Sequence, residues 1–188
     1  MDPFNNFMRP NLDVLFVGLN PATASAERQH YFSTTAHFWN RLYDSGLITR
    51  ALRCRNLDGY ADELVFGQTT YNAHNWSYGI TDLMRTVVET NSQKVKPTTE
   101  DCKAFCDSIR IFKPRVVVLM GGKVYDSIIK YCRLSRQVSN EYGNIGRLLA
   151  GCDTTFFYVP FPTSMQMNKL EMARLYSLVR LYLEEKLA

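Results

Sequence analysis

The sequence predicts an α/β fold: a three-layer α/β/α sandwich around a central, mainly parallel sheet of roughly four strands. Short apolar runs rich in Val and Phe alternate along the chain with segments in which apolar residues recur at helical spacing. The apolar runs are nearly continuous, as in strands that helices cover on both faces. Strands that alternate with helices in this way form βαβ units, which build a parallel sheet.

Three runs predict the central strands. They are Asp13–Gly18 (DVLFVG), Arg115–Met120 (RVVVLM) and Thr154–Val159 (TTFFYV). Each is short and rich in the β-branched and aromatic residues that strands favour.

Helices are expected between and after these strands. The spacing of Phe38, Leu42 and Leu47 predicts one across Ala36–Arg50. A second begins at a cap formed by Thr98 or Thr99 and ends before Pro114, because proline cannot continue a helix.

Two further helices complete the pattern. One begins near Lys123, and the last is opened by Asn168 with Glu171 three residues later. Its buried stripe is expected to be Met172, Leu175, Val179 and Tyr182. The polar, weakly periodic segments are interpreted as loops or short helices: Arg53–Ser77, Val88–Pro97 and Arg133–Gly151.

Length and composition restrict the class of protein. The chain has 188 residues, which favours a single domain over residues 1–188, and 46% apolar with 21% charged residues argues against intrinsic disorder. No run approaches the roughly 20 apolar residues that span a bilayer, and the N-terminus lacks the basic and apolar regions of a signal peptide. We therefore expect neither secretion nor membrane insertion, and a bacterial-type cytoplasm or a eukaryotic nucleus.

The net charge and the cysteine content exclude fewer classes of protein than the length and composition do. A formal net charge of +4 tolerates a polyanion without requiring one. The five cysteines are odd in number and scattered, with no CxxC pair, so the sequence indicates neither a disulfide framework nor a metal site. We expect no metal and no cofactor.

Three segments follow the predicted strands, where the ligand site of such a sheet forms. They are Gly18–Ala22 (GLNPA), Gly121–Lys123 (GGK) and Pro160–Met165 (PFPTSM). Taken singly, each is an ordinary turn signal. The GGK turn is not a phosphate loop, because a valine stands where that motif has its first glycine and Val124 stands where it has its hydroxyl residue.

Taken together, the segments resemble the uracil-DNA glycosylase superfamily, and within it most closely the mismatch-specific uracil/thymine-DNA glycosylases. The stretch from Gly18 to Leu47 (GLNPATASAERQHYFSTTAHFWNRLYDSGL) is similar to the first family signature, a G-[IL]-N-P-G turn, an aromatic residue and a helix that opens F-W. Trp76–Leu83 resembles the G-[IV]-T-x-L segment, and Val116–Ile128 resembles the L-G-K-x-A-Y stretch. The resemblance runs, with gaps, from about residue 13 to 185.

The resemblance implies a DNA glycosylase that flips a nucleotide out of the duplex and cleaves its N-glycosidic bond. Asn20 matches the asparagine that holds the attacking water. An amide cannot act as a general base, so we expect a slower enzyme than relatives that carry a carboxylate there. The ring that stacks on the base corresponds to Tyr31 or Phe32, and backbone N–H groups around Ala22 and Thr23 correspond to the donors to the base.

The last segment departs from the family pattern, N-P-[ST]-[GP]-L-S. Phe161 replaces its asparagine, which removes polar readout next to the base and puts strict uracil selectivity in doubt. The resemblance implies that Thr163 and Ser164 contact a DNA phosphate and that Met165 fills the gap left by the flipped base. Lys123 is expected to contact the DNA backbone as well.

Ala22 also departs from the family glycine, and an alanine would be strained there if the position needed a positive φ. The expected function is thus monofunctional excision of uracil or a related deaminated base from damaged or mismatched DNA, by a monomer. Because of Ala22 and Phe161, a member of the superfamily that binds nucleic acid or a nucleobase without cleaving remains an alternative. A flavodoxin-like nucleotide-binding module that uses the GGK turn is a third.

Overall fold

The structure is a computed structural model that describes residues 7–52, 56, 58–132, 141–164 and 166–187. Within these ranges the chain forms a five-stranded sheet of order β2-β1-β3-β5-β4. Four strands are mutually parallel: β1 (Val14–Gly18), β2 (Tyr78–Asp82), β3 (Val116–Met120) and β5 (Thr155–Val159). The edge strand β4 (Gly143–Gly146) pairs antiparallel to β5.

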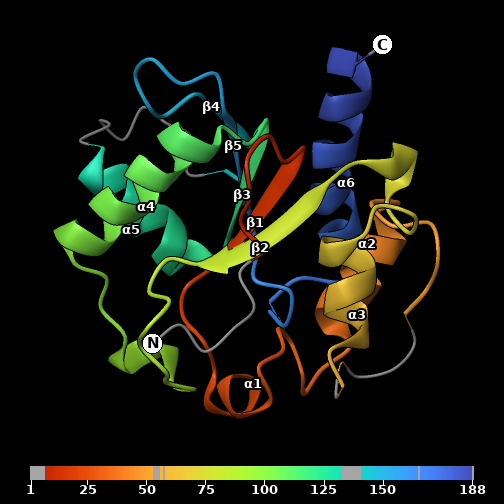
Figure 1. Ribbon diagram of the computed structural model, residues 1–188, viewed down its shortest axis with the longest axis horizontal. Coiled ribbons are helices and arrows are strands. Elements are labelled where there is room, and N and C mark those ends of the chain that lie inside the picture. Colours follow the sequence, from red (N-terminus) through yellow and green to blue (C-terminus); the bar gives the residue numbers. More distant parts are fainter. Residues whose placement is uncertain (1–6, 53–55, 57, 133–140, 165, 188) are drawn as a thin grey trace.

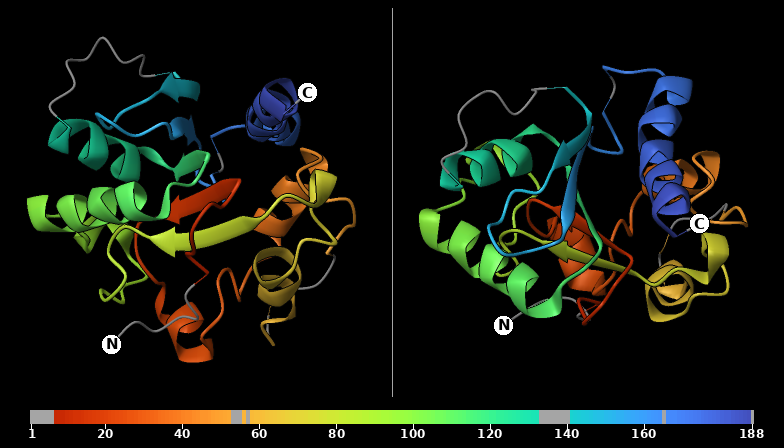
Figure 2. Two further views of the ribbon diagram at one scale, coloured as in Figure 1. Left: turned by 45° about the horizontal axis from the view of Figure 1, so that its top comes forward. Right: turned by 90° about the horizontal axis from the view of Figure 1, so that it is seen from above.

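Helices cover both faces of this sheet, as Figures 1 and 2 show. One face carries α4 (Thr99–Phe112) and α5 (Gly122–Tyr131), and the other carries α2 (His37–Asp44) and α6 (Lys169–Leu187). The chain also forms α1 (Thr23–Arg28) and α3 (Tyr60–Asp62), a π-helical turn η1 (Glu63–Gly67), and two 3-10 turns, η2 (Ala73–Asn75) and η3 (Ser92–Lys94). The predicted three-layer α/β/α sandwich is therefore confirmed.

Strict alternation along the strands separates two hydrophobic cores. In β1, Val14 and Phe16 pack toward α2 and α6, whereas Leu15 and Val17 pack toward α4 and α5. The strands β3 and β5 alternate in the same way. Because both faces are buried, each central strand reads as a continuous apolar run, which is what made these strands predictable.

The three predicted strands match β1, β3 and β5 closely, and the helix expected after Thr98 is α4. Thr98 and Asp101 form a capping box: the Thr98 Oγ1 accepts from the Asp101 N–H, and the Asp101 carboxylate accepts from the Thr98 N–H. Asn168 accepts a bond from the Glu171 N–H at 2.9 Å, as its position before α6 predicted.

Three expectations need correction. The sheet has a fifth strand, β4, which lies in a segment interpreted as loop because it is short and has glycine at both ends. The helix expected to reach Arg50 ends at Asp44, because Gly46 adopts a φ of +73° and turns the chain. On α6, Tyr176 and Leu183 are fully buried, whereas Leu175 and Tyr182 are only partly buried.

The carboxyl ends of β1, β2, β3 and β5 share one edge of the sheet, because these strands are parallel. The chain leaves β1 there for α1, which lies beyond this edge in Figure 1. No helix in the described part of the chain has the length and apolar character needed to cross a membrane.

Candidate functional site

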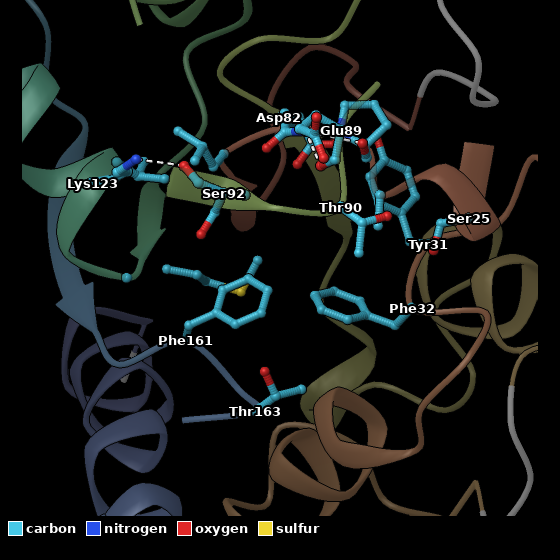
Figure 3. A pocket seen from close by; sticks show the side chains of 18 of the residues that line it. Ser25, Tyr31, Phe32, Asp82, Glu89, Thr90, Ser92, Lys123, Phe161 and Thr163 are labelled. Carbon is cyan, nitrogen blue, oxygen red and sulfur yellow. Dashed lines mark hydrogen bonds between the residues drawn. The ribbon is translucent and has the colours of Figure 1, made fainter. Parts of the chain in front are cut away.

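A cavity of about 590 Å³ lies at the carboxyl edge of the sheet. Its walls come from the segments that follow the strands: Gly18–Ala22 after β1, Asp82 at the end of β2, Gly121–Lys123 after β3, and Phe161 and Thr163 after β5. The turn before α2 adds Tyr31 and Phe32, and the loop after β2 adds Glu89, Thr90 and Ser92 (Figure 3). The three strand-end segments singled out in the sequence thus meet in one cavity.

Asn20 lines this cavity, and its side-chain amide is fixed in one orientation. The Nδ2 donates to the backbone carbonyl oxygens of Pro21 at 3.0 Å, Val87 at 3.1 Å and Glu89 at 2.7 Å. Three carbonyl oxygens around one end of the amide require the NH₂ group there, because the amide oxygen would be repelled. The Oδ1 is therefore left as an acceptor, and it takes no hydrogen bond from the described residues.

The loop after β2 reaches Asn20 because it runs alongside the turn after β1. Leu83 and Met84 donate from their backbone N–H groups to the carbonyl oxygens of Gly18 and Leu19, both at 2.9 Å, and the Glu89 N–H donates to the Pro21 carbonyl at 3.0 Å. These bonds extend the β1–β2 pairing beyond the sheet edge. Asn20 then ties the far end of the loop to the same turn.

Ala22 is the residue before α1 and lines the cavity with a φ of −72° and a ψ of 146°. Any L-residue adopts this extended conformation without strain, so alanine in place of the family glycine costs nothing in backbone geometry. This finding removes one of the two observations that favoured a non-cleaving protein. The Ala22 N–H donates to none of the described residues.

Thr23, by contrast, is not among the residues that line the cavity. Its backbone N–H donates to the Thr90 Oγ1 at 3.1 Å, and the two threonine hydroxyls lie 3.1 Å apart. In this arrangement the N–H is not available to a bound base. Of the two predicted donors, the Ala22 N–H is the one that is not bonded to another described residue.

Tyr31 and Phe32 form an aromatic wall of the cavity. Tyr31 is buried, whereas Phe32 is partly exposed and stacks on Phe38 with ring centroids 4.3 Å apart and 13° between the planes. Figure 3 shows Phe32 and Phe161 turned toward each other across the cavity. The sequence left Tyr31 and Phe32 as alternatives. Phe32 presents the more accessible ring to the cavity.

Phe161 lies close enough to Phe32 to restrict what enters. Their ring centroids are 6.0 Å apart at 42°. A base stacked between two rings needs about 7 Å, because carbon atoms in contact are separated by roughly 3.5 Å. As they stand, the two rings are therefore too close for a base to lie between them, and Phe161 is 38% exposed.

Asp82 is a cavity residue that the sequence analysis did not single out, and the residue is only 7% exposed. It pairs with Gly18 across β1 and β2, and a Cβ on Gly18 would lie 2.2 Å from the Asp82 Oδ1. The glycine of the GLNP turn thus leaves space for this carboxylate. The available signal was an acidic residue at the end of a buried strand-like run.

The residues expected to contact DNA take different positions. Thr163 is exposed and lines the cavity, whereas Ser164 lies outside the lining and donates from its N–H to the Phe161 carbonyl at 2.9 Å. The Lys123 ammonium donates to the carbonyl oxygens of Ser92 and, at 3.1 Å, Val95, so it also fastens the loop after β2. Met165 lies outside the described residues.

Behind the aromatic wall lies a buried carboxyl group, Asp62, which is 3% exposed. Burial raises its pKa from 3.8 to about 7, although hydrogen bonds from the Tyr31 N–H and from Asn56 oppose the shift. Among the described residues, no three His, Cys, Asp or Glu side chains gather as metal ligands do. The polar side chains that line the cavity are those of Asn20, Asp82, Glu89 and Lys123, together with several hydroxyl groups.

The chain matches a known family. Residues 6–180 match the model of the uracil DNA glycosylase superfamily, which covers all the strands and the segments that line the cavity. With a mainly parallel sheet covered on both faces and a strand-end cavity around Asn20, the chain belongs to the uracil DNA glycosylase superfamily.

Proposed function

We propose that the protein is a monofunctional DNA glycosylase that hydrolyses the N-glycosidic bond of uracil or a related deaminated base in DNA. The observation that carries this proposal is the orientation of Asn20. Its NH₂ group is held by the carbonyl oxygens of Pro21, Val87 and Glu89, so its Oδ1 is fixed as an acceptor at the cavity. A fixed acceptor at that place orients a water molecule toward the sugar of an extrahelical nucleotide.

The chemistry needs little more than such positioning. Cleavage builds positive charge on the deoxyribose and negative charge on the departing base, so groups that stabilise the base anion lower the barrier. The Ala22 N–H is the donor that we assign to the base. A single donor of this kind is typically worth about 3 kcal/mol in the transition state. Asn20 contributes by holding the water in attacking geometry.

The cavity suits a flipped base. Its volume of about 590 Å³ falls within the roughly 300–1,000 Å³ typical of small-ligand sites. Phe32 provides the stacking face, and stacking on a ring is worth about 1–3 kcal/mol per base, which offsets part of the cost of flipping. Asp82 provides an acceptor for an N–H group of the base.

Phe161 broadens the substrate range in this proposal. A phenyl ring offers neither donor nor acceptor, so it cannot discriminate uracil from other deaminated bases by hydrogen bonds. Discrimination then depends on shape and on Asp82. We infer a preference that is less strict than that of an enzyme with an amide at position 161.

In this proposal the protein acts as a monomer, and the DNA strand lies across the mouth of the cavity. Thr163 and Ser164 bind a backbone phosphate, Lys123 adds positive charge, and Met165 fills the space that the base vacates. The pattern G-L-N-P followed by Phe38-Trp39 supports a place near the mismatch-specific uracil/thymine-DNA glycosylases.

The test is a base-excision panel. Duplex and single-stranded oligonucleotides that carry uracil, hypoxanthine, xanthine or a thymine mismatch are incubated with the protein, and abasic sites are revealed by alkaline strand scission. We expect product from at least uracil, with DNA binding that weakens as salt rises. Binding of these DNAs without an abasic product from any of them would contradict the proposal and leave the non-cleaving alternative.

A further inference from the structure

A buried hydrogen-bond network holds the peptide groups of the aromatic wall from behind. The Asp62 Oδ2 accepts from the Tyr31 N–H at 2.9 Å, and the Asp62 Oδ1 accepts from the Asn56 Nδ2. The same Nδ2 donates to the Tyr31 carbonyl at 3.0 Å. Both peptide groups that flank Tyr31 are thus bound to one pair of side chains, which we call the Asp62–Asn56 clamp.

Both ends of the Asn56 side-chain amide are hydrogen-bonded in the clamp. Its two N–H donors go to Asp62 and Tyr31, and its Oδ1 accepts from the Ala61 N–H at 3.0 Å. Asn56 is 1% exposed and Asp62 is 3% exposed. Burying an ionisable group is costly unless it is bonded, so this pair is not an incidental surface contact.

Phe32, the next residue, has a strained backbone. Its φ is +50°, in the left-handed region that aromatic residues rarely adopt. Such a conformation persists only where the surroundings impose it, and it tends to occur at functional sites. The Tyr31 carbonyl belongs to the peptide plane that carries the Phe32 nitrogen, so fixing that carbonyl fixes one side of the φ rotation.

We propose that Asp62 and Asn56 are positioning residues that hold Phe32 in place as the stacking surface for an extrahelical base. The inference rests on the proposed function and extends it to two residues that do not line the cavity. The clamp fixes the Tyr31–Phe32 peptide, and the stack on Phe38 supports the ring from the side away from the cavity.

A substitution that conserves the shape of the side chain distinguishes the positioning role of Asp62 from a contribution to packing alone. In Asp62→Asn, the new amide keeps an acceptor for the Tyr31 N–H but turns its NH₂ group toward the Asn56 Nδ2, which is also a donor. Asn56 cannot rotate its amide to accept, because it would lose both the Tyr31 carbonyl and the Ala61 N–H. The clamp therefore breaks although the volume of the side chain is conserved.

The experiment compares Asp62→Asn, Phe32→Ala, the double variant and a control, Thr154→Val. Thr154 is equally buried and donates from its Oγ1 to the Pro114 carbonyl at 2.6 Å, at the opposite edge of the sheet from the cavity. Each protein is assayed for single-turnover excision of uracil, for affinity toward undamaged duplex, and for base flipping by fluorescence of 2-aminopurine placed beside the uracil.

We expect Asp62→Asn and Phe32→Ala each to lower the excision rate and the flipping signal about tenfold, with duplex affinity within about twofold of the wild type. The double variant should be no slower than Phe32→Ala alone, because Asp62 acts through the ring. Thr154→Val should keep the full rate. The inference is overturned if Asp62→Asn lowers the excision rate by the same factor in the wild type and in Phe32→Ala. It is also overturned if Asp62→Asn alone keeps the full excision rate.

A crystal structure of Asp62→Asn tests the clamp whether or not the proposed function is correct. If the wild type excises no base, the proposed function fails, and the position of Phe32 still decides whether the clamp holds the ring. We expect Phe32 to leave its left-handed conformation and its stack on Phe38. An unchanged Phe32 would overturn the clamp whatever the activity of the protein.

Discussion

Position 20 requires a side chain that donates on one side and accepts on the other. The NH₂ group of Asn20 meets the carbonyl oxygens of Pro21, Val87 and Glu89, and its Oδ1 accepts no hydrogen bond from the described residues. An aspartate would place a carboxylate oxygen against those carbonyl oxygens, with no proton between them unless it were neutral. The loop after β2 therefore explains why this chain uses an amide where a carboxylate is the stronger base.

Phe161 controls the width of the cavity, and its removal tests this directly. Because its ring lies 6.0 Å from that of Phe32, Phe161→Ala should admit larger bases more readily. We expect the ratio of hypoxanthine to uracil excision rates, measured in single turnovers, to rise on the order of tenfold. Ile111→Ala, an apolar truncation of an exposed residue on α4, should leave the ratio unchanged. A ratio that stays constant or falls in Phe161→Ala would show that the ring does not limit access.

At the residue scale, the sequence predicted the cavity residues that follow strands and missed those that depend on tertiary contacts. Asn20, Ala22 and Phe161 could be assigned from their place after buried strands and from the family resemblance. Asp82 was missed although it ends a buried strand-like run, and the bond that removes the Thr23 N–H from the cavity could not be predicted. The latter depends on Thr90, which is 67 residues away and is brought close by the loop after β2.

The caps and turns of single elements carry stability without touching the cavity. Thr98→Ala removes the Oγ1 that accepts from the Asp101 N–H at the start of α4. We expect a loss of about 1 kcal/mol in the free energy of unfolding, measured by urea denaturation. The excision rate should stay within twofold, because α4 contributes no residue to the cavity lining. Thr98→Ser, which keeps the hydroxyl, is the matched control, and a loss of the same size in that variant would argue against the cap.

At the element scale, predictability followed apolar sequence rather than burial alone, because β2 (YGITD) is fully buried but was not assigned as a strand. The strands β1, β3 and β5 are apolar on both faces, so their sequences mark them unambiguously. The strand β4 has a polar, glycine-flanked sequence, and it forms because β5 offers a free edge. The early end of α2 likewise depends on Gly46, whose left-handed φ no periodicity of apolar residues reveals.

For the whole molecule, Asp62 makes stability depend on pH. Its pKa is raised by burial to about 7 in the folded protein from an ordinary 3.8. The carboxyl group therefore contributes stability that is fully present below about pH 4 and is lost as the pH rises to 7, because the unfolded chain releases this proton first. Relative to Asp62→Asn, which does not titrate, the wild type should lose roughly 4 kcal/mol of unfolding free energy across this range.

Chemical denaturation of both proteins at several pH values measures this difference. Above about pH 7 the difference should be constant, because the carboxyl group is then ionised in both states. A difference that is flat between pH 4 and 7, or that favours the wild type as the pH rises, would show that Asp62 is not buried as described.

The two hydrophobic cores determine where the cavity residues at the strand ends lie. Alternating side chains of β1, β3 and β5 anchor the sheet between two helical layers, and this rigid sheet sets the position of the turn that carries Asn20. The turn is then tied to the loop after β2 by backbone bonds and by Asn20 itself. Residues far apart in sequence thus hold one acceptor at a fixed place.

The most direct test of that claim is the single-turnover rate of uracil excision by the wild type, Asn20→Ala and Asn20→Asp at neutral pH. We expect Asn20→Ala to lose about 100-fold with nearly unchanged affinity for duplex DNA, because the water loses its acceptor. Asn20→Asp should be no faster than the wild type, because its carboxylate faces the carbonyl oxygens of Val87 and Glu89. An Asn20→Ala variant that excises uracil at the wild-type rate would contradict the account.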